Sequence, residues 1–171
     1  MAFLERQDAE VAARVFAGIP AASLAALRDA PPTEWVSWEH DKYFPESVIR
    51  EFGEERAHQL WRAYLPTHLK SGRFRNLVDS AIRLFGLKPS SLIKVLPRAW
   101  SQSFQGFCEL EVTQSAHRIG RLSMSNIPPC IEDWPSYAFS HKAIFEAIFD
   151  ITKVEGEIEV KSEPAFHRRE Y

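Results

Sequence analysis

Residues 107–114 read FCELEVTQ, and in this segment the hydrophobic period of the chain changes from that of a helix to that of a strand. The chain can turn back around Gly120, so that residues 121–126 pair with the first strand. The segment therefore predicts a β-hairpin. Alternate residues of the first strand are expected to face the core: Cys108, Leu110, Val112 and Gln114.

Helical patterns precede this hairpin. Two strong amphipathic helices are expected at residues 71–85, ended by Gly86, and at residues 90–104, where Pro97 should kink or break the helix near Leu96. An irregular aromatic stretch containing Trp35, Trp38, Tyr43 and Phe44 is expected to pack over the core. Shorter helices are expected at residues 4–16, 23–28, 45–52 and 54–64.

A helix at residues 136–151 and a second hairpin follow. Val154, Ile158 and Val160 alternate with charged residues and predict a strand, and residues 165–171 are expected to return beside it. The order predicts an α+β fold, in which N-terminal helices and a helical hairpin pack on a small antiparallel sheet made of two β-hairpins. We expect a single domain over residues 1–171, with a helical part at 1–70 and a core at 71–171.

Composition narrows the function classes. The chain has 171 residues, about one domain, and its formal net charge of -2 argues against nucleic acid as a partner. Cys108 and Cys130 are too few for a disulfide framework, and we find no signal segment and no apolar run of about 20 residues, so we expect a cytoplasmic protein without a membrane span. The common nucleotide-binding, hydrolase and zinc-protease motifs are absent, which lowers the expectation of an enzyme.

Several motifs resemble those of a paralogue family of unknown function found in myxobacteria. That family is similar to the superfamily of ligand-binding domains that includes haem nitric-oxide sensors, 4-vinyl reductase domains and vesicle-tethering transport-particle subunits. The resemblance covers roughly residues 71–171. The resemblance rests on residues 74–86 from Phe74 to Gly86, the segments LPRAW at 96–100 and FQG at 104–106, Gly120, and Pro128-Pro129.

The resemblance implies helices packed on a twisted antiparallel sheet, with a pocket that holds haem, a lipid chain or another hydrophobic compound. Haem sensors carry a Tyr-x-Ser-x-Arg signature, which this chain lacks, so haem is possible but disfavoured and the cofactor is unknown. The 4-vinyl reductase domains carry a C-terminal cysteine cluster, which is also absent here.

His141 is the most informative histidine. It lies on the apolar face of the last long helix, where an imidazole can ligate a metal, contact a polar head group, or simply hydrogen-bond a backbone carbonyl at the edge of the core. Lys94 and Arg98 lie four residues apart and form either a small anion-binding patch or a solvated helix face. A zinc set of Cys108, His117, Cys130 and His141 is disfavoured, because it lacks the short spacings of structural zinc sites.

Three functions stay open. The first is a non-catalytic binding or sensory module for a hydrophobic or amphiphilic small molecule, in which Arg98 or His141 fixes the head group and a signalling partner or homodimer reports occupancy. The second is a protein-interaction or dimerising scaffold with a vestigial pocket, and the third is an enzyme on a hydrophobic small molecule, with His141 or Glu109 as general base. The residues expected to bind the ligand are Phe74, Val78, Leu96, Arg98, Trp100, His141 and Phe145.

Overall fold

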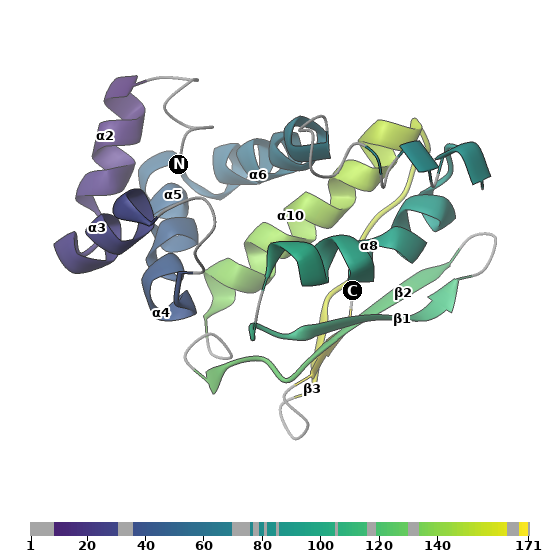
Figure 1. Ribbon diagram of the computed structural model, residues 1–171. Helices are drawn as coiled ribbons and strands as arrows, with labels where there is room; N and C mark the ends of the chain where they lie inside the picture. The colour runs from purple at the N-terminus through teal and green to yellow at the C-terminus, as the bar shows by residue number, and fades with distance from the viewer. Residues whose placement is uncertain are drawn as a thin grey trace.

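The N-terminal half of the chain is helical (Figure 1). The structure is a computed structural model, and it describes residues 9–30, 36–69, 76, 79–80, 82–84, 86–104, 106–115, 119–129, 134–163 and 168–170. The helices of this half are α2 (Ala9–Ala17), α3 (Ala21–Asp29), α4 (Trp38–Asp41), α5 (Tyr43–Phe52) and α6 (Glu54–Leu69). Two further helices are α8 (Pro89–Ser103) and α10 (Pro135–Thr152).

The fold class is α+β, as the sequence predicts. Strands β1 (Glu109–Ser115), β2 (Gly120–Ser125), β3 (Lys161–Glu163) and β4 (Arg168–Glu170) form one sheet in the order β1-β2-β4-β3. All neighbouring strands are antiparallel, so β1–β2 and β3–β4 are two hairpins joined through β2 and β4. Helices α8 and α10 lie over this sheet in Figure 1.

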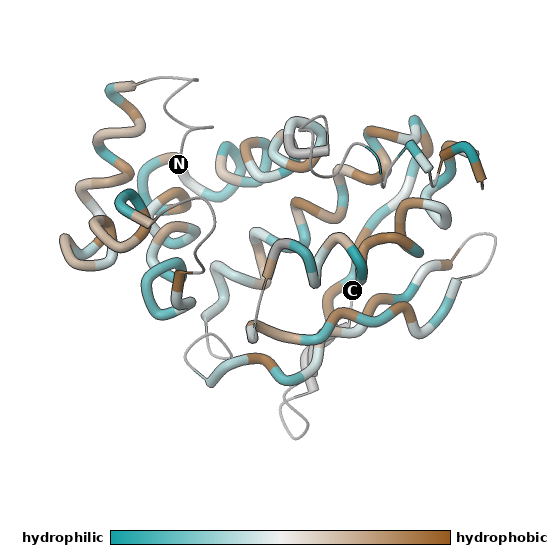
Figure 2. The backbone as a smooth tube through the Cα atoms, in the orientation of Figure 1, coloured by the Kyte–Doolittle hydropathy of each residue, from teal (hydrophilic) through white to brown (hydrophobic). Residues whose placement is uncertain are grey.

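Buried and exposed side chains alternate along the first part of β1, and the buried ones face these helices. Leu110 is buried opposite Met124, and Val112 is half-buried opposite Leu122. Figure 2 shows the same alternation as bands of hydrophobic and hydrophilic residues along the hairpin. Gln114, expected to face inward, is exposed, because the register shifts between Val112 and Gln114 and changes the side on which later residues point.

Phe107 also departs from the predicted alternation, because it is buried where an exposed residue is expected. Strict alternation would place it on the outer face with Glu109, but it is only 3% exposed. The reason is local. β1 begins at Glu109, and Gly106 has a φ of 64°, so the chain turns immediately before Phe107 and the strand period does not apply to it. Cys108, which is half-buried, packs against the same core.

The break of the helix expected near Leu96 does not occur. α8 continues through Pro97 to Ser103, because the buried side chains of Leu92 and Trp100 hold the helix against the core on both sides of the proline. The stretch expected to be irregular is helical from Trp38 onward, since that residue begins α4 and Tyr43 begins α5. The prediction that Gly86 follows a helix is confirmed: its φ is 77°, and its N–H donates to the carbonyl of Ile82 at 2.8 Å.

The strand predicted from Val154, Ile158 and Val160 is not formed at these residues. The segment with Val154, Ile158 and Val160 forms no ladder, and β3 begins only at Lys161. Ile158 and Val160 are half-buried against the core beside the sheet, so their alternation reflects packing of an extended segment without a strand partner. The predicted helix of residues 71–85 lies mostly outside the described residues.

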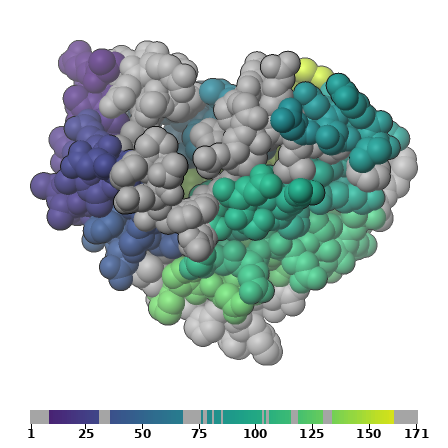
Figure 3. Space-filling view, in the orientation of Figure 1, coloured from purple at the N-terminus to yellow at the C-terminus, as the bar shows by residue number. Residues whose placement is uncertain are grey.

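Two core clusters lie on either side of the molecule and share α10. One cluster forms between α8, α10 and the sheet and contains Trp100, Phe107 and Phe145, while the other forms among α2, α5 and α6 around Val15 and Val48. Phe139 of α10 packs against the second cluster. In Figure 3 the N-terminal helices and the segment from α8 to β2 occupy opposite sides of the face shown. α10 therefore joins the two parts of the chain.

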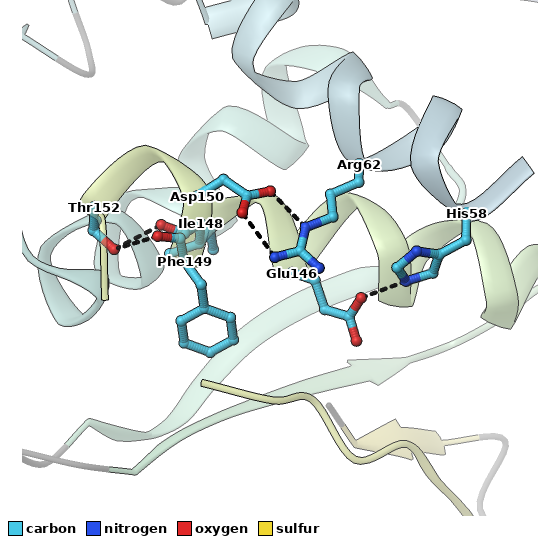
Figure 4. A network of polar contacts seen from close by, with 7 residues as sticks. All are labelled: His58, Arg62, Glu146, Ile148, Phe149, Asp150 and Thr152. Atoms are coloured by element: carbon cyan, nitrogen blue, oxygen red, sulfur yellow. Dashed lines mark hydrogen bonds and ion pairs between the residues drawn. The ribbon is translucent and has the colours of Figure 1, made fainter. Parts of the chain in front are cut away.

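Polar contacts between side chains join α6 to α10 (Figure 4). Nε2 of His58 lies 2.5 Å from Oε2 of Glu146, and one turn further on Arg62 binds Asp150 through two nitrogens, at 2.5 and 2.7 Å. Lys142 lies 3.9 Å from the other oxygen of Glu146. Glu146 is the more buried carboxylate, with 12% of its side chain exposed against 45% for Asp150. We call these pairs the α6–α10 ladder.

The two rungs of the α6–α10 ladder should differ in strength. We expect Asp150→Ala to lower the free energy of unfolding at neutral pH by less than about 1 kcal/mol, because exposed ion pairs contribute little. Glu146→Ala should cost about 1–3 kcal/mol, because it removes a buried acceptor and leaves His58 without this partner. Urea denaturation measures both values. A larger loss for Asp150→Ala would contradict the dependence on burial.

The Asp150 contribution should also depend on pH. The hydrogen bond from Arg62 lowers the pKa of Asp150, so its stabilising effect is present at neutral pH and is lost as the pH falls through that lowered pKa. The difference in stability between wild type and Asp150→Ala should therefore shrink in acid. Unfolding midpoints of both proteins across the acidic range test this, and a difference that grows in acid would contradict it.

Candidate functional site

An aromatic cluster surrounds His141. α10 places Tyr137, His141 and Phe145 at intervals of four residues, which puts them on one face of the helix. The centroid of the His141 ring lies 5.3 Å from that of Tyr137 and 6.2 Å from that of Phe145. Other elements supply the remaining rings: Trp38 of α4, Trp100 of α8, and Phe104 and Phe107 between α8 and β1. We call these seven rings the aromatic cluster.

Burial divides the aromatic cluster into a floor and a rim. The floor consists of the five buried rings, those of Trp100, Phe107, Tyr137, His141 and Phe145. Among them, Trp100 is 8% exposed, Tyr137 3% and Phe145 2%. Trp38 and Phe104, at the rim, are half-buried, and their ring centroids lie 5.2 Å apart. The centroid of Trp38 lies 3.9 Å from that of Phe107 in the floor, so this rim ring packs directly against a buried one. This gradient leaves apolar aromatic surface accessible at the rim.

His141 is held in place inside the floor. Its Nδ1 donates a hydrogen bond to the carbonyl of Tyr137 at 2.8 Å, and its ring lies 5.2 Å from Trp100 between centroids. The residue is 7% exposed. Of the interpretations given above, the structure therefore shows the backbone hydrogen bond. This bond assigns the proton to Nδ1, since a carbonyl oxygen can only accept.

Asp41 is the acidic group of the site. The hydroxyl of Tyr137 donates to its Oδ2 at 2.5 Å, across 96 residues of sequence. Burial raises the pKa of the Asp41 carboxyl, and the hydrogen bond from Tyr137 and the positive charge of the N-terminal amine each oppose part of this rise. Burial and the charge of Asp41 also raise the pKa of Tyr64, to about 12. Within the described residues, no Lys, Arg or His side chain forms an ion pair with Asp41.

The structure brings together only part of the predicted ligand-binding set. Trp100, His141 and Phe145 share the floor, and half-buried Leu96 packs against it. Arg98 is exposed, and two positions along a helix place it about 200° around α8 from Trp100. Arg98 and His141 therefore do not face one site, and the idea that both fix one head group fails. Phe74 and Val78 lie outside the described residues.

None of the sequence-based predictions placed Asp41, Tyr137 and the rim ring of Trp38 in one site. Tyr137 carried a usable signal, because it precedes His141 by four residues on the same helix face. Asp41 carried none, since its contact with Tyr137 depends entirely on how α4 packs against α10. Of the disfavoured zinc set, His117 and Cys130 lie outside the described residues. Among the residues the structure describes, no three His, Cys, Asp or Glu side chains group as metal ligands.

Comparison of the chain with models of protein families, with curated proteins and with solved structures finds no match. None of the helices within the described ranges is both long and apolar enough to cross a membrane. The aromatic cluster and Asp41 are therefore the features of the chain that bear on its function.

The raised pKa of Asp41 predicts a gain in stability when its charge is removed. Asp41→Asn keeps an oxygen that can accept from Tyr137 but carries no charge, so we expect the free energy of unfolding to rise at about pH 7. Because the folded state binds the proton more tightly than the unfolded state, the penalty in the wild type disappears as the pH falls. The gain should vanish near about pH 3.

Urea denaturation of wild type and Asp41→Asn across this range measures the effect. Glu39→Gln is the matched control, because Glu39 lies on the same short helix but is exposed. Its stability should differ from that of the wild type by less than about 0.5 kcal/mol. A loss of stability in Asp41→Asn at neutral pH would show that the carboxylate is fully compensated within the folded chain.

Proposed function

We propose that this protein is a non-catalytic module that binds a hydrophobic or amphiphilic small molecule at the rim of the aromatic cluster. The observation that carries the proposal is the carboxyl of Asp41, whose pKa burial raises, beside a gradient of aromatic rings. Ligand sites combine a mostly apolar wall with a few polar groups that orient the ligand. Trp38 and Phe104 supply the wall here, and Asp41 with the Tyr137 hydroxyl supplies the polar group.

The energetic cost of Asp41 supports the same function. A carboxyl whose pKa is raised by burial destabilises the folded chain when it is ionised. Groups that reduce stability in this way cluster at functional sites, where binding or chemistry uses them. The proposal also agrees with the resemblance of residues 71–171 to a ligand-binding superfamily, which we include as part of it. It replaces Arg98 by Asp41 as the residue that contacts the head group.

Binding of octyl glucoside, a neutral amphiphile, tests the proposal. We expect it to bind below its micelle concentration and to raise the melting temperature. Phe104→Ala should weaken binding by about tenfold to a hundredfold, which corresponds to the apolar burial of one ring. Arg98→Ala is the control and should bind as the wild type does within about twofold, since Arg98 lies on the exposed side of α8.

Native mass spectrometry of freshly purified protein, with denaturing extraction, provides an independent readout. We expect a small molecule to remain bound to the wild type and to be lost from Phe104→Ala. The proposal would be abandoned if the purified chain carries no ligand and octyl glucoside leaves both the mass spectrum and the melting temperature unchanged.

One observation favours a second candidate function, a dimerising scaffold. Among the residues that the structure describes, four large apolar side chains are exposed: Leu84 is 74% exposed, Ile119 56%, and Leu87 and Val154 46% each. Such residues mark contact surfaces when they gather. Light scattering distinguishes this candidate: a constitutive dimer that dissociates in Ile119→Glu and carries no ligand would favour the scaffold over the binding module.

A further inference from the structure

We propose that one end of the molecule docks on an anionic lipid surface, with exposed apolar side chains inserted among the lipids and basic side chains against their phosphate groups. This end lies away from the rim of the aromatic cluster, and docking there goes beyond the small-molecule binding proposed above. Three features support it: the place where exposed apolar side chains gather, the charges beside them, and the availability of those charges.

The exposed apolar side chains gather at one end of the fold. Within the described residues they are Leu84, Leu87, Ile119 and Val154. They come from the segment before α8, the turn between β1 and β2, and the segment after α10. Figure 1 shows these three segments at the same end of the molecule, on the right of the view. The turn touches the start of α8, because a Cβ added to Gly120 would lie 2.6 Å from Cδ1 of Ile93. We call these segments the apolar end.

Turns are unusual places for large apolar side chains, since small and polar residues dominate them. The N–H of Lys88 donates to the carbonyl of Gly86 at 3.1 Å, which places Leu87 at the apex of a three-residue turn. The N–H of Val154 donates to the carbonyl of Phe149 at 3.2 Å, in the turn that ends α10. Local hydrogen bonds therefore fix both apolar residues at the surface, where each stays 46% exposed.

Each of these apolar side chains has an exposed basic neighbour within two residues along the chain. The pairs are Leu84 with Arg83, Leu87 with Lys88, Ile119 with Arg121, and Val154 with Lys153. The described segments 79–88, 119–121 and 153–155 also contain two acidic residues, Asp79 and Glu155, so basic residues outnumber acidic ones. The whole chain has a formal net charge of -2. The apolar end is thus locally basic on a chain that is slightly acidic.

Most of these basic charges are available to a partner. Among the residues that the structure describes, no ion pair includes Arg83, Lys88 or Arg121. Lys153 differs, because its charge helps to lower the pKa of Asp150 near the end of α10. Lys and Arg side chains beside exposed apolar residues are the combination that binds anionic membrane surfaces, where phosphates attract the charges and the lipids accept the apolar groups.

A lipid surface suits the apolar end better than a second copy of the chain. In a twofold dimer a surface patch meets itself, so the basic side chains of one copy would face those of the other. Like charges brought together oppose association. An anionic leaflet supplies the opposite charge, and its fluid interior accepts apolar side chains from separate turns without a matching groove. Charge complementarity therefore favours the lipid surface.

Vesicle sedimentation of the wild-type protein tests the inference. Vesicles of phosphatidylcholine alone are compared with vesicles of equal parts phosphatidylcholine and phosphatidylglycerol. We expect the mixed vesicles to bind at least about tenfold more tightly, because their charge is opposite to that of the apolar end. Raising the salt concentration from about 0.1 M to about 1 M should remove most of this preference, since the Debye length falls from about 10 Å to about 3 Å.

Two charge reversals on neighbouring parts of the chain locate the binding surface. Lys88→Glu should weaken binding to the mixed vesicles by about thirtyfold, since each unit of charge near an anionic membrane is worth about 1 kcal/mol, or about fivefold. Arg98→Glu is the matched control, because Arg98 is also exposed but lies about 13 Å along α8 from its first residue. It should bind within about twofold of the wild type, beyond the Debye length at about 0.1 M salt.

Leu87→Ser tests the apolar contribution separately. It should weaken binding about threefold to tenfold at both salt concentrations, because the insertion of an apolar side chain is not screened by salt. Thermal melts establish that this variant and the two charge reversals are folded.

The outcomes that overturn the inference are specific. It fails if vesicles of neither composition bind, if both compositions bind equally, or if Lys88→Glu and Arg98→Glu weaken binding to the same extent. It also fails if light scattering shows a dimer that Leu87→Ser dissociates while vesicles do not bind, because the apolar end then contacts a second copy.

Phe104→Ala separates this inference from the proposed function. Phe104 follows the opposite end of α8 and belongs to the rim of the aromatic cluster, so its replacement should leave vesicle binding unchanged. Loss of vesicle binding in Phe104→Ala would mean that lipid is taken up at the rim, which supports the proposed function and overturns docking through the apolar end.

Discussion

Helix α10 has to bury nearly its whole circumference, and the rest of the structure is arranged to meet this constraint. A helix that is apolar on all sides needs neighbours on all sides. The sheet and α8 cover the face with Tyr137 and Phe145, and α6 with the second cluster covers the face with Phe139 and Glu146. Several buried polar side chains of α10 hydrogen-bond to the preceding turn of the helix itself. Thr152 donates to the carbonyl of Ile148 at 2.8 Å, and His141 to that of Tyr137.

Local patterns in the sequence predict the elements that α10 organises. The change of period at residues 107–114 identifies β1, and the apolar spacing of residues 136–151 identifies α10 within one residue at each end. These predictions succeed because each element places a regular set of side chains against one core. Where a residue packs without belonging to a regular element, the same logic fails. Phe107 follows a turn, and Ile158 lies in an extended segment without a ladder partner.

The candidate site is harder to predict than the fold, because it depends on contacts between distant segments. His141 could be placed on an apolar face from its neighbours along the helix. Asp41 could not be placed beside Tyr137, since 96 residues separate them and no local pattern links α4 to α10. Arg98 illustrates the opposite error. Its position near Trp100 in sequence suggested a shared pocket, whereas the helical geometry turns it away.

The site and the α6–α10 ladder use α10 for different purposes. Along one side, Glu146 accepts from His58 and lies near Lys142, and Asp150 pairs with Arg62, so both carboxylates have partners within the chain. On the side of the aromatic cluster, Tyr137 presents its hydroxyl to a carboxyl whose pKa is raised by burial. The first arrangement holds the fold together. The second costs stability and is the arrangement on which the proposed binding function rests.

The pairing of α6 with α10 also sets the order of events during synthesis. His58 and Arg62 meet partners that lie 88 residues further along the chain. At about 5–20 residues per second, α6 waits on the order of 5–20 s for α10 to be synthesised. During that interval the apolar surface of the N-terminal helices that α10 later covers has no native neighbour. The nascent chain is thus exposed to non-native association until its last long helix leaves the ribosome.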